Sequence, residues 1–144
     1  MTVAAVLEDA GRFLLVEENI SGRSVFNQPA GHLEDNESLE DAVIRETLEE
    51  TAWHFRPDAI IGIYRWRHPD TQQTFVRVSF SGQCLYHETG RELDSDIERT
   101  LWLSADEIRQ QQDRLRSPMV MRSIDDYLSG KAWPLTLLTD VEDL

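Results

Sequence analysis

The chain has 144 residues, of which 40% are hydrophobic, so it is long enough for one domain with a buried core and too short for two ordinary domains. Its 27 acidic and 14 basic residues give a net charge of −13, which disfavours binding to nucleic acid polymers or to an anionic membrane surface. No apolar run approaches the roughly 20 residues of a membrane span, and the start MTVAAVLEDAGRF lacks the basic region of a signal peptide.

The first part of the chain predicts a β-hairpin followed by a helix. Residues 2–7 and 12–16 are short apolar runs, and Asp9-Ala10-Gly11 between them is a turn signal. Residues 17–26 are polar and predict a connection without strands. The segment NQPAG has the Pro and Gly of a fixed turn. It leads into a helix that we expect over residues 38–51, with Asn36 as its N-terminal cap.

The middle of the chain predicts further strands, over residues 59–65, 74–85 and 100–103. The second of these alternates regularly between two faces and contains Cys84, which we expect to be a small buried core residue. Trp53 and Trp102 are expected in the core as well. A single cysteine excludes an intrachain disulfide and suits a reducing, cytoplasmic location.

The C-terminal part predicts two helices and an unassigned tail. Ser104 is expected to cap a helix over residues 105–111, with Glu107 completing a capping box. Ser117-Pro118 predicts the start of an amphipathic helix that reaches residue 128. A central helix between strands, followed by terminal helices, predicts a single α/β domain over residues 1–144 with a mixed sheet flanked by helices.

Three glutamates on one face of the central helix are the strongest chemical signal. At about 100° per residue, Glu46, Glu49 and Glu50 lie at i, i+3 and i+4. Like charges at this spacing destabilise a helix by about 0.2–0.5 kcal/mol per pair. The same face is apolar one to two turns earlier, at Leu39, Ala42 and Val43. Partly buried carboxylates in such a group need a cation, and oxygen ligands favour Mg²⁺ or Mn²⁺.

The spacing around these glutamates is highly specific. It runs Gly31, five residues, Glu37, seven residues, Arg45-Glu46, two residues, Glu49-Glu50. This pattern resembles the Nudix box, G-x5-E-x7-R-E-U-x-E-E-x-G-U, in which U is a bulky apolar residue. A solvated, Glu-rich helix is the alternative for the glutamates taken alone, and the six matching identities argue against it.

Two positions depart from the box. Thr47 stands at an apolar position, where its methyl group replaces part of a larger contact. Ala52 stands where the box has Gly, just past the expected helix end. An Ala in the left-handed conformation costs roughly 1 kcal/mol or more, unless the helix end shifts. Because neither position supplies a carboxylate, we expect a working site with an altered helix exit.

The resemblance extends over most of the chain. The segments NQPAGHLE, LDSDIERTLWLSADEI and RLRSPMVMRSIDDYLSGK are similar to the NudJ phosphatase branch of the Nudix hydrolases. This resemblance implies an α/β/α sandwich with a mixed sheet and a Mg²⁺-dependent phosphohydrolase. It also implies nucleoside tri- and diphosphates as substrates, together with thiamine diphosphate and hydroxymethylpyrimidine diphosphate.

The resemblance further implies roles for individual residues. Metal ligands are implied at Glu46, Glu49, Glu50 and, through its carbonyl, Gly31. Glu46 is also implied as the acceptor of a proton from the attacking water, with Glu49 and Arg45 completing the catalytic group. Arg45 is expected to orient a glutamate, and Glu37 to pair with a nearby cation.

A further acidic ligand is expected from the loop before the last strand, and the sequence leaves Asp94, Asp96 and Glu98 open. A calcium loop of the EF-hand type is excluded, because Arg99 and Ala105 stand where that loop needs Gly and Glu. A solvated acidic loop is the alternative to a ligand role for these residues.

Candidate substrate-binding residues are fewer. Arg77 is a candidate for contact with phosphate, with a surface ion pair as the alternative. Trp66, with His68 and Phe75, is a candidate for stacking on a ring, with core packing as the alternative. No polar cluster for reading a base is evident in the sequence, so we expect weak contact with the base.

The sequence thus predicts an enzyme acting on a small phosphorylated substrate, as a monomer or a small homo-oligomer. One alternative is a nucleotide-sensing module of the same fold that does not cut its ligand, and Ala52 is the feature that favours it. Another is a structural protein whose acidity serves a basic partner. Metal-dependent release of phosphate separates the enzyme from both.

Overall fold

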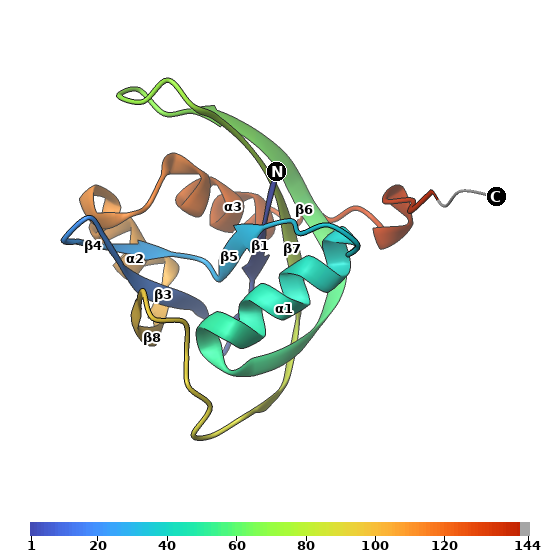
Figure 1. Ribbon diagram of the computed structural model, residues 1–144, viewed down its shortest axis with the longest axis horizontal. Helices are drawn as coiled ribbons and strands as arrows, with labels where there is room; N and C mark the ends of the chain where they lie inside the picture. The colour runs from blue at the N-terminus through green and yellow to red at the C-terminus, as the bar shows by residue number, and fades with distance from the viewer. Residues whose placement is uncertain (142–144) are drawn as a thin grey trace.

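The structure is a computed structural model that describes residues 1–141, so the last three residues of the expected 1–144 domain lie outside it. Its elements are shown in Figure 1. The strands are β1 (Thr2–Val6), β2 (Glu8–Asp9), β3 (Arg12–Ile20), β4 (Arg23–Asn27), β5 (Ala30–His32), β6 (Trp53–Arg67), β7 (Thr74–His87) and β8 (Ile97–Ser104). The helices are α1 (Leu39–Thr51), α2 (Ala105–Gln110) and α3 (Pro118–Leu128), with the 3₁₀ turns η1 (Gln112–Arg114) and η2 (Leu135–Leu137).

Two sheets form the body of the protein. The first has the order β5-β1-β7-β6, in which β1 and β7 are parallel and the other neighbours are antiparallel. The mixed sheet predicted from the sequence is therefore confirmed. The second sheet is antiparallel, with β3 paired to β2, β4 and β8. The sequence did not predict it, because residues 17–26 were expected to form a loop.

Helices cover both faces of the first sheet. Alternate side chains of β1 point to opposite faces. Val3 and Ala5 pack with Val43 of α1, while Val6 packs with Ile124 of α3. Figure 1 shows α1 in front of this sheet and α3 behind it. The helix–sheet–helix sandwich is thereby confirmed.

The expectation of a polar connection over residues 17–26 is wrong. β3 continues to Ile20, and a turn at Ser21-Gly22, where both residues have positive φ, leads into β4. Glu17 and Glu18 are buried although they are acidic, because each pairs with arginine. Buried, paired charges can thus occupy strand positions that look like loop in the sequence.

The strand predicted over residues 59–65 is longer than expected. It begins at Trp53, immediately after α1, and ends at Arg67. Pro57 lies within it, and the pairing with β7 shifts register between Pro57 and Ala59. Because β6 is the edge strand of its sheet, a proline without an N–H group is tolerated there.

The ends of the helices follow local chemistry. Ser38 caps α1, accepting a hydrogen bond from the Asp41 N–H at 3.0 Å, so the prediction of Asn36 as the cap is wrong. At the other end Ala52 has φ 62°, the left-handed conformation expected at the glycine position of the motif. The capping box of α2 and the Ser-Pro start of α3 are confirmed.

Three residues expected in the core lie at its margin. Cys84 is half-buried, and this burial raises the pKa of its thiol to about 11, so the thiol is protonated at neutral pH. Trp53 and Trp102 are half-buried and make an edge-to-face contact with ring centroids 6.3 Å apart.

Within residues 1–141, no helix is both long and apolar enough to cross a membrane.

Replacing Thr47 by Val should stabilise the protein. Thr47 is fully buried in α1, and its hydroxyl has no hydrogen-bond partner within the described residues. Val keeps the shape and removes the unpaired polar group, so we expect Thr47→Val to raise the free energy of unfolding by about 1 kcal/mol in urea denaturation.

Thr51→Val is the matched control, one turn later in the same helix. The Thr51 hydroxyl donates to the Thr47 carbonyl at 2.6 Å and accepts from the Trp53 N–H at 3.2 Å. This variant should therefore lose stability, by about 1 kcal/mol or more. Equal losses in the two variants would contradict the assignment of Thr47 as an unpaired group.

Candidate active site

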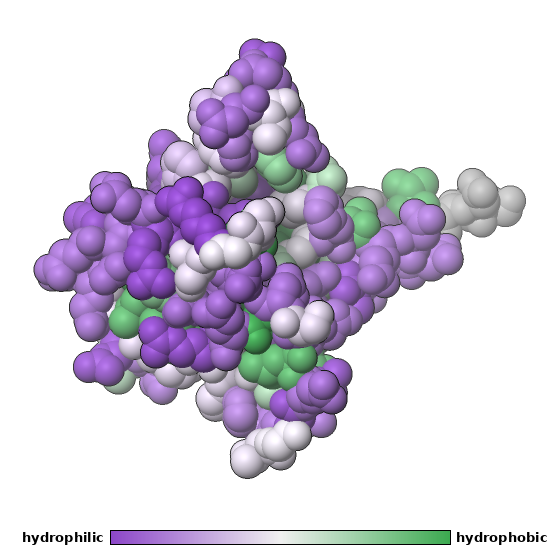
Figure 2. Space-filling view, turned by 60° about the vertical axis from the view of Figure 1, so that its left-hand side comes forward, coloured by the Kyte–Doolittle hydropathy of each residue, from purple (hydrophilic) through white to green (hydrophobic). Residues whose placement is uncertain are grey.

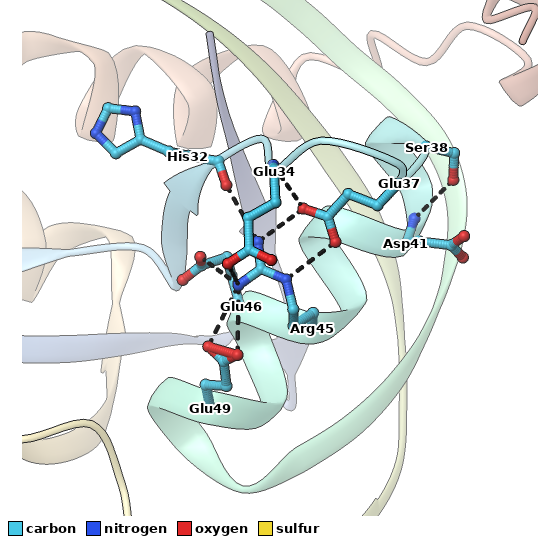
Figure 3. Close-up of polar contacts among 8 residues, drawn as sticks. All are labelled: His32, Glu34, Glu37, Ser38, Asp41, Arg45, Glu46 and Glu49. Carbon is cyan, nitrogen blue, oxygen red and sulfur yellow. Dashed lines mark hydrogen bonds and ion pairs between the residues drawn. The ribbon is translucent and has the colours of Figure 1, made fainter.

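The guanidinium of Arg45 organises the carboxylates of α1, as Figure 3 shows. It binds both oxygens of Glu37, with Nε–Oε2 and Nη2–Oε1 distances of 3.0 and 2.8 Å. Its Nη1 donates to Glu46 at 2.8 Å and to Glu49 at 3.3 Å, and its Nη2 donates to the His32 carbonyl at 3.1 Å. The bidentate contact with Glu37 contributes most to raising the pKa of Arg45, and it lowers the pKa of Glu37.

Glu46 and Glu49 form a candidate metal site together with Asp94. Each of the three offers a carboxylate oxygen, and these oxygens lie within 4.8 Å of one another. The loop that carries Asp94 is attached to the end of α1, since the Asp94 N–H donates to the Glu49 carbonyl at 3.0 Å. Burial raises the pKa of Glu46 and of Asp94, and neighbouring carboxylates add to both shifts. A bound cation would favour the ionised form of both carboxylates and so offset these pKa shifts.

The other two acidic candidates of this loop lie outside the group. Asp96 lines the same cleft without joining Glu46 and Glu49. Glu98 lies on β8, where it is exposed and accepts a hydrogen bond from Ser24 at 3.4 Å. Of the three candidates that the sequence left open, the geometry therefore favours Asp94.

Glu50 lies apart from the other two glutamates of the motif. Its Oε1 accepts a hydrogen bond from the Ala30 N–H at 2.9 Å, which ties α1 to the start of β5. Burial raises the pKa of Glu50 to about 9, and the charges of Glu18 and Glu46 add to the shift. The side chain would need a cation nearby to be ionised at neutral pH.

Gly31 makes the close approach of β5 and α1 possible. A Cβ atom at this position would overlap the carboxylate of Glu46. Any side chain here would therefore displace Glu46 from its place beside Arg45. The glycine at the start of the motif is thus required sterically, in addition to any role of its carbonyl.

A cleft of about 600 Å³ adjoins the carboxylates, and its lining includes Glu46, Glu50 and Asp94. Side chains of the β6–β7 hairpin, which projects from the body in Figure 1, also line it. Trp66 stacks on Phe75 there, with ring centroids 5.9 Å apart and an interplanar angle of 25°. The cleft is within the size range of ligand sites in proteins.

Arg77 also lines the cleft, and it is buried. The alternative of a surface ion pair is wrong, since Arg77 is only 4% exposed. Its Nη1 donates to Gln28 at 3.1 Å and its Nη2 to Asn27 at 3.2 Å, and its Nε has no partner within residues 1–141. Burial lowers the pKa of Arg77 to about 10, so the group is still charged at neutral pH.

A polar cluster that the sequence did not reveal lies in the same cleft. Glu18 on β3 accepts hydrogen bonds from Asn27 at 3.2 Å and from Arg116 at 2.8 Å. All three residues line the cleft together with Arg77. The sequence had indicated no polar cluster for reading a base, and this cluster is a candidate that it did not reveal. Sequence reasoning missed it because residues 17–26 were taken for a loop, which hid the pairing of β3 with β4.

Comparison with known proteins identifies the family. The family model of the NUDIX domain matches residues 1–123. Phosphatase NudJ of Escherichia coli strain K12 and that of Shigella flexneri are each 42% identical to this chain over 140 residues, covering 97% of the chain and 90% of the relative.

Solved structures agree with this assignment. A NUDIX hydrolase from Nitrosomonas europaea matches with 46% identity and a TM-score of 0.95, covering 97% of this chain and 95% of the other. The NUDIX domain of Shewanella oneidensis NrtR, solved with ADP ribose, has the same fold at 19% identity and a TM-score of 0.69, covering 89% and 85%. With its motif, its fold and a near full-length relative in agreement, this chain belongs to the Nudix hydrolase family.

Proposed function

We propose that this Nudix hydrolase is a Mg²⁺-dependent phosphatase that removes the terminal phosphate of nucleoside tri- and diphosphates, with Mn²⁺ able to replace Mg²⁺. Thiamine diphosphate and hydroxymethylpyrimidine diphosphate are proposed as further substrates. The observation that carries the proposal is the group of Glu46, Glu49 and Asp94 beside a cleft of nucleotide size. The likeness to the phosphatases named NudJ supports removal of a terminal phosphate.

The carboxylates fit the metal that the family requires. Glu46, Glu49 and Asp94 would hold it, and we propose Glu50 and the Gly31 carbonyl, whose residues line the same cleft, as further ligands. When bound, Mg²⁺ would supply the charge that neutralises phosphate oxygens and activates water for attack. The oxygen-only donor set suits a hard divalent cation.

The protein's own groups position the reaction. Arg45 holds Glu46 and Glu49 against their mutual repulsion, so we propose that it orients both carboxylates. Glu46 lines the cleft and is held by Arg45 at 2.8 Å, so we propose that it accepts the proton of the attacking water.

The rest of the cleft suits the remainder of the substrate. Arg77 is a buried cation whose hydrogen bonds go to neutral side-chain amides, so we propose that it attracts a phosphate oxygen. Trp66, stacked on Phe75, offers an aromatic surface for a ring. We propose a small-molecule substrate, a cytoplasmic location and a monomer or small homo-oligomer.

Phosphate release should depend on the metal and on Glu49. We expect orthophosphate from nucleoside triphosphates with Mg²⁺ or Mn²⁺ and none in excess EDTA. Glu49→Gln and Asp94→Asn should each lower kcat/KM by at least about 10²-fold, because each removes a charge that helps to hold the cation. Colorimetric orthophosphate detection with increasing Mg²⁺ measures both effects.

Glu98→Gln is the control, since Glu98 belongs to the same acidic segment and lies outside the carboxylate group. It should keep the wild-type rate. Nucleotide binding without phosphate release, in a protein that keeps all its carboxylates, would favour the sensing module instead. Turnover that survives EDTA would place the chemistry elsewhere.

The first products should be the nucleoside diphosphate and orthophosphate. The likeness to the phosphatases named NudJ is the ground for expecting attack at the terminal phosphorus. Phosphorus NMR of ATP during the reaction distinguishes the two outcomes. Pyrophosphate and AMP as first products would contradict removal of the terminal phosphate while leaving the family assignment intact.

A further inference from the structure

Glu18 is a buried carboxylate in the cleft that lies outside the metal-ligand group. Only 4% of the residue is exposed, yet its side chain lines the cleft. It is fixed from two sides, by Asn27 on β4 and by Arg116 just before α3. A carboxylate held in this way has a defined position and can act as a directional acceptor.

The hydrogen-bonding capacity of Glu18 is only partly used. An ionised carboxylate has about four lone-pair sites. Within the described residues, Glu18 accepts one hydrogen bond at each oxygen, at 3.2 Å from Asn27 and at 2.8 Å from Arg116. Burial raises its pKa, and Arg116 and Asn27 oppose that shift. A further N–H donor from a ligand would therefore stabilise the charged form.

The surroundings of Glu18 suit a heterocyclic ring. Trp66 and Phe75 line the same cleft as a stacked pair, and Ile20 and Met119 add apolar surface. The surface of the face seen in Figure 2 is mainly hydrophilic, with its apolar residues in small separate areas. Glu18 lines the same cleft as Glu46, Glu50 and Asp94. A ring near Glu18 could thus belong to a molecule whose phosphates reach the carboxylates.

We propose that Glu18 accepts a hydrogen bond from an amino group on the substrate's ring, so that the cleft selects amino-substituted rings such as adenine and cytosine. The inference rests on the proposed function, since the ring belongs to the leaving group of the same reaction. A substrate lacking the amino group would bury Glu18 without that donor and bind the transition state less well.

A purely structural role for Glu18 is the competing explanation, because its contact with Arg116 joins β3 to the segment before α3. The two roles make different predictions. Arg116→Gln breaks the ion pair and keeps the carboxylate, whereas Glu18→Gln removes the charge and one acceptor oxygen. A purely structural role would make Glu18→Gln slower or less stable with all substrates alike, and would leave the ratios between substrates unchanged.

The test compares substrates that differ at the amino group. We would measure kcat/KM with Mg²⁺ for ATP and purine riboside triphosphate, which lacks only the 6-amino group, and for CTP and UTP. For the wild-type protein, kcat/KM should be at least about tenfold higher for ATP than for purine riboside triphosphate. It should likewise be higher for CTP than for UTP. In Glu18→Gln these ratios should fall below about threefold.

Glu17→Gln is the matched control, because Glu17 is the preceding residue of β3, is similarly buried, pairs with Arg99 and Arg114, and does not line the cleft. Glu17→Gln should keep the wild-type ratios. Circular dichroism and thermal unfolding would confirm that each variant is folded.

Two failures are distinguishable. Wild-type ratios near one in both substrate pairs, with metal-dependent turnover intact, would overturn the role of Glu18 alone, even if Glu18→Gln does not fold. Wild-type ratios in a folded Glu18→Gln variant would also overturn it. If no nucleotide releases phosphate, the proposed function fails, and dissociation constants for the same pairs with Ca²⁺ in place of Mg²⁺ still decide whether Glu18 selects the amino group.

Discussion

The site depends on one constraint: several carboxylates must be held close together on one partly buried helix face. Glu46 and Glu49 repel each other at that spacing, and burial adds to the cost of ionising Glu46. The guanidinium of Arg45 reduces this repulsion, because it donates hydrogen bonds to both Glu46 and Glu49. Glu37 binds the guanidinium in a bidentate contact. Glu37 therefore fixes the position of Arg45, and Arg45 in turn fixes the carboxylates of Glu46 and Glu49.

The backbone around α1 serves the same constraint. Gly31 leaves room for the carboxylate of Glu46, and the Ala30 N–H binds Glu50. At the other end of the helix, the Asp94 N–H binds the Glu49 carbonyl and brings a carboxylate from a distant loop into the group. Two segments, β5 and the loop that carries Asp94, thus meet α1, and each is fixed by a hydrogen bond to the helix.

Features that depend on residues close together in the sequence could be predicted, whereas features that depend on contacts between distant segments could not. The face of Glu46 and Glu49 depends on helical spacing alone, so it was visible, as were the caps of α2 and α3. The choice of Asp94 over its neighbours depends on a contact across 45 residues, and the sequence left it open. Glu18 was missed because its burial requires Asn27 and Arg116, which only the folded sheet places beside it. Asn36 was predicted as the cap because residue 38 was expected to be the first residue of the helix, and a shift of this size lies within the uncertainty of a helix boundary.

The net charge of −13 raises the question of how such a chain accepts a polyphosphate. Exposed charges act weakly beyond about 8 Å at physiological ionic strength, so acids scattered over the surface contribute little inside the cleft. Arg77 acts at short range, in surroundings of low dielectric constant, where a charge has a stronger effect. Its hydrogen bonds run to Asn27 and Gln28, which are neutral, so its charge is not cancelled by an ion pair. Glu18 and Glu50 also line the cleft and lie within electrostatic reach of Arg77. The local field therefore depends on the balance between these carboxylates, Arg77 and a bound cation, and distant surface acids contribute little to it.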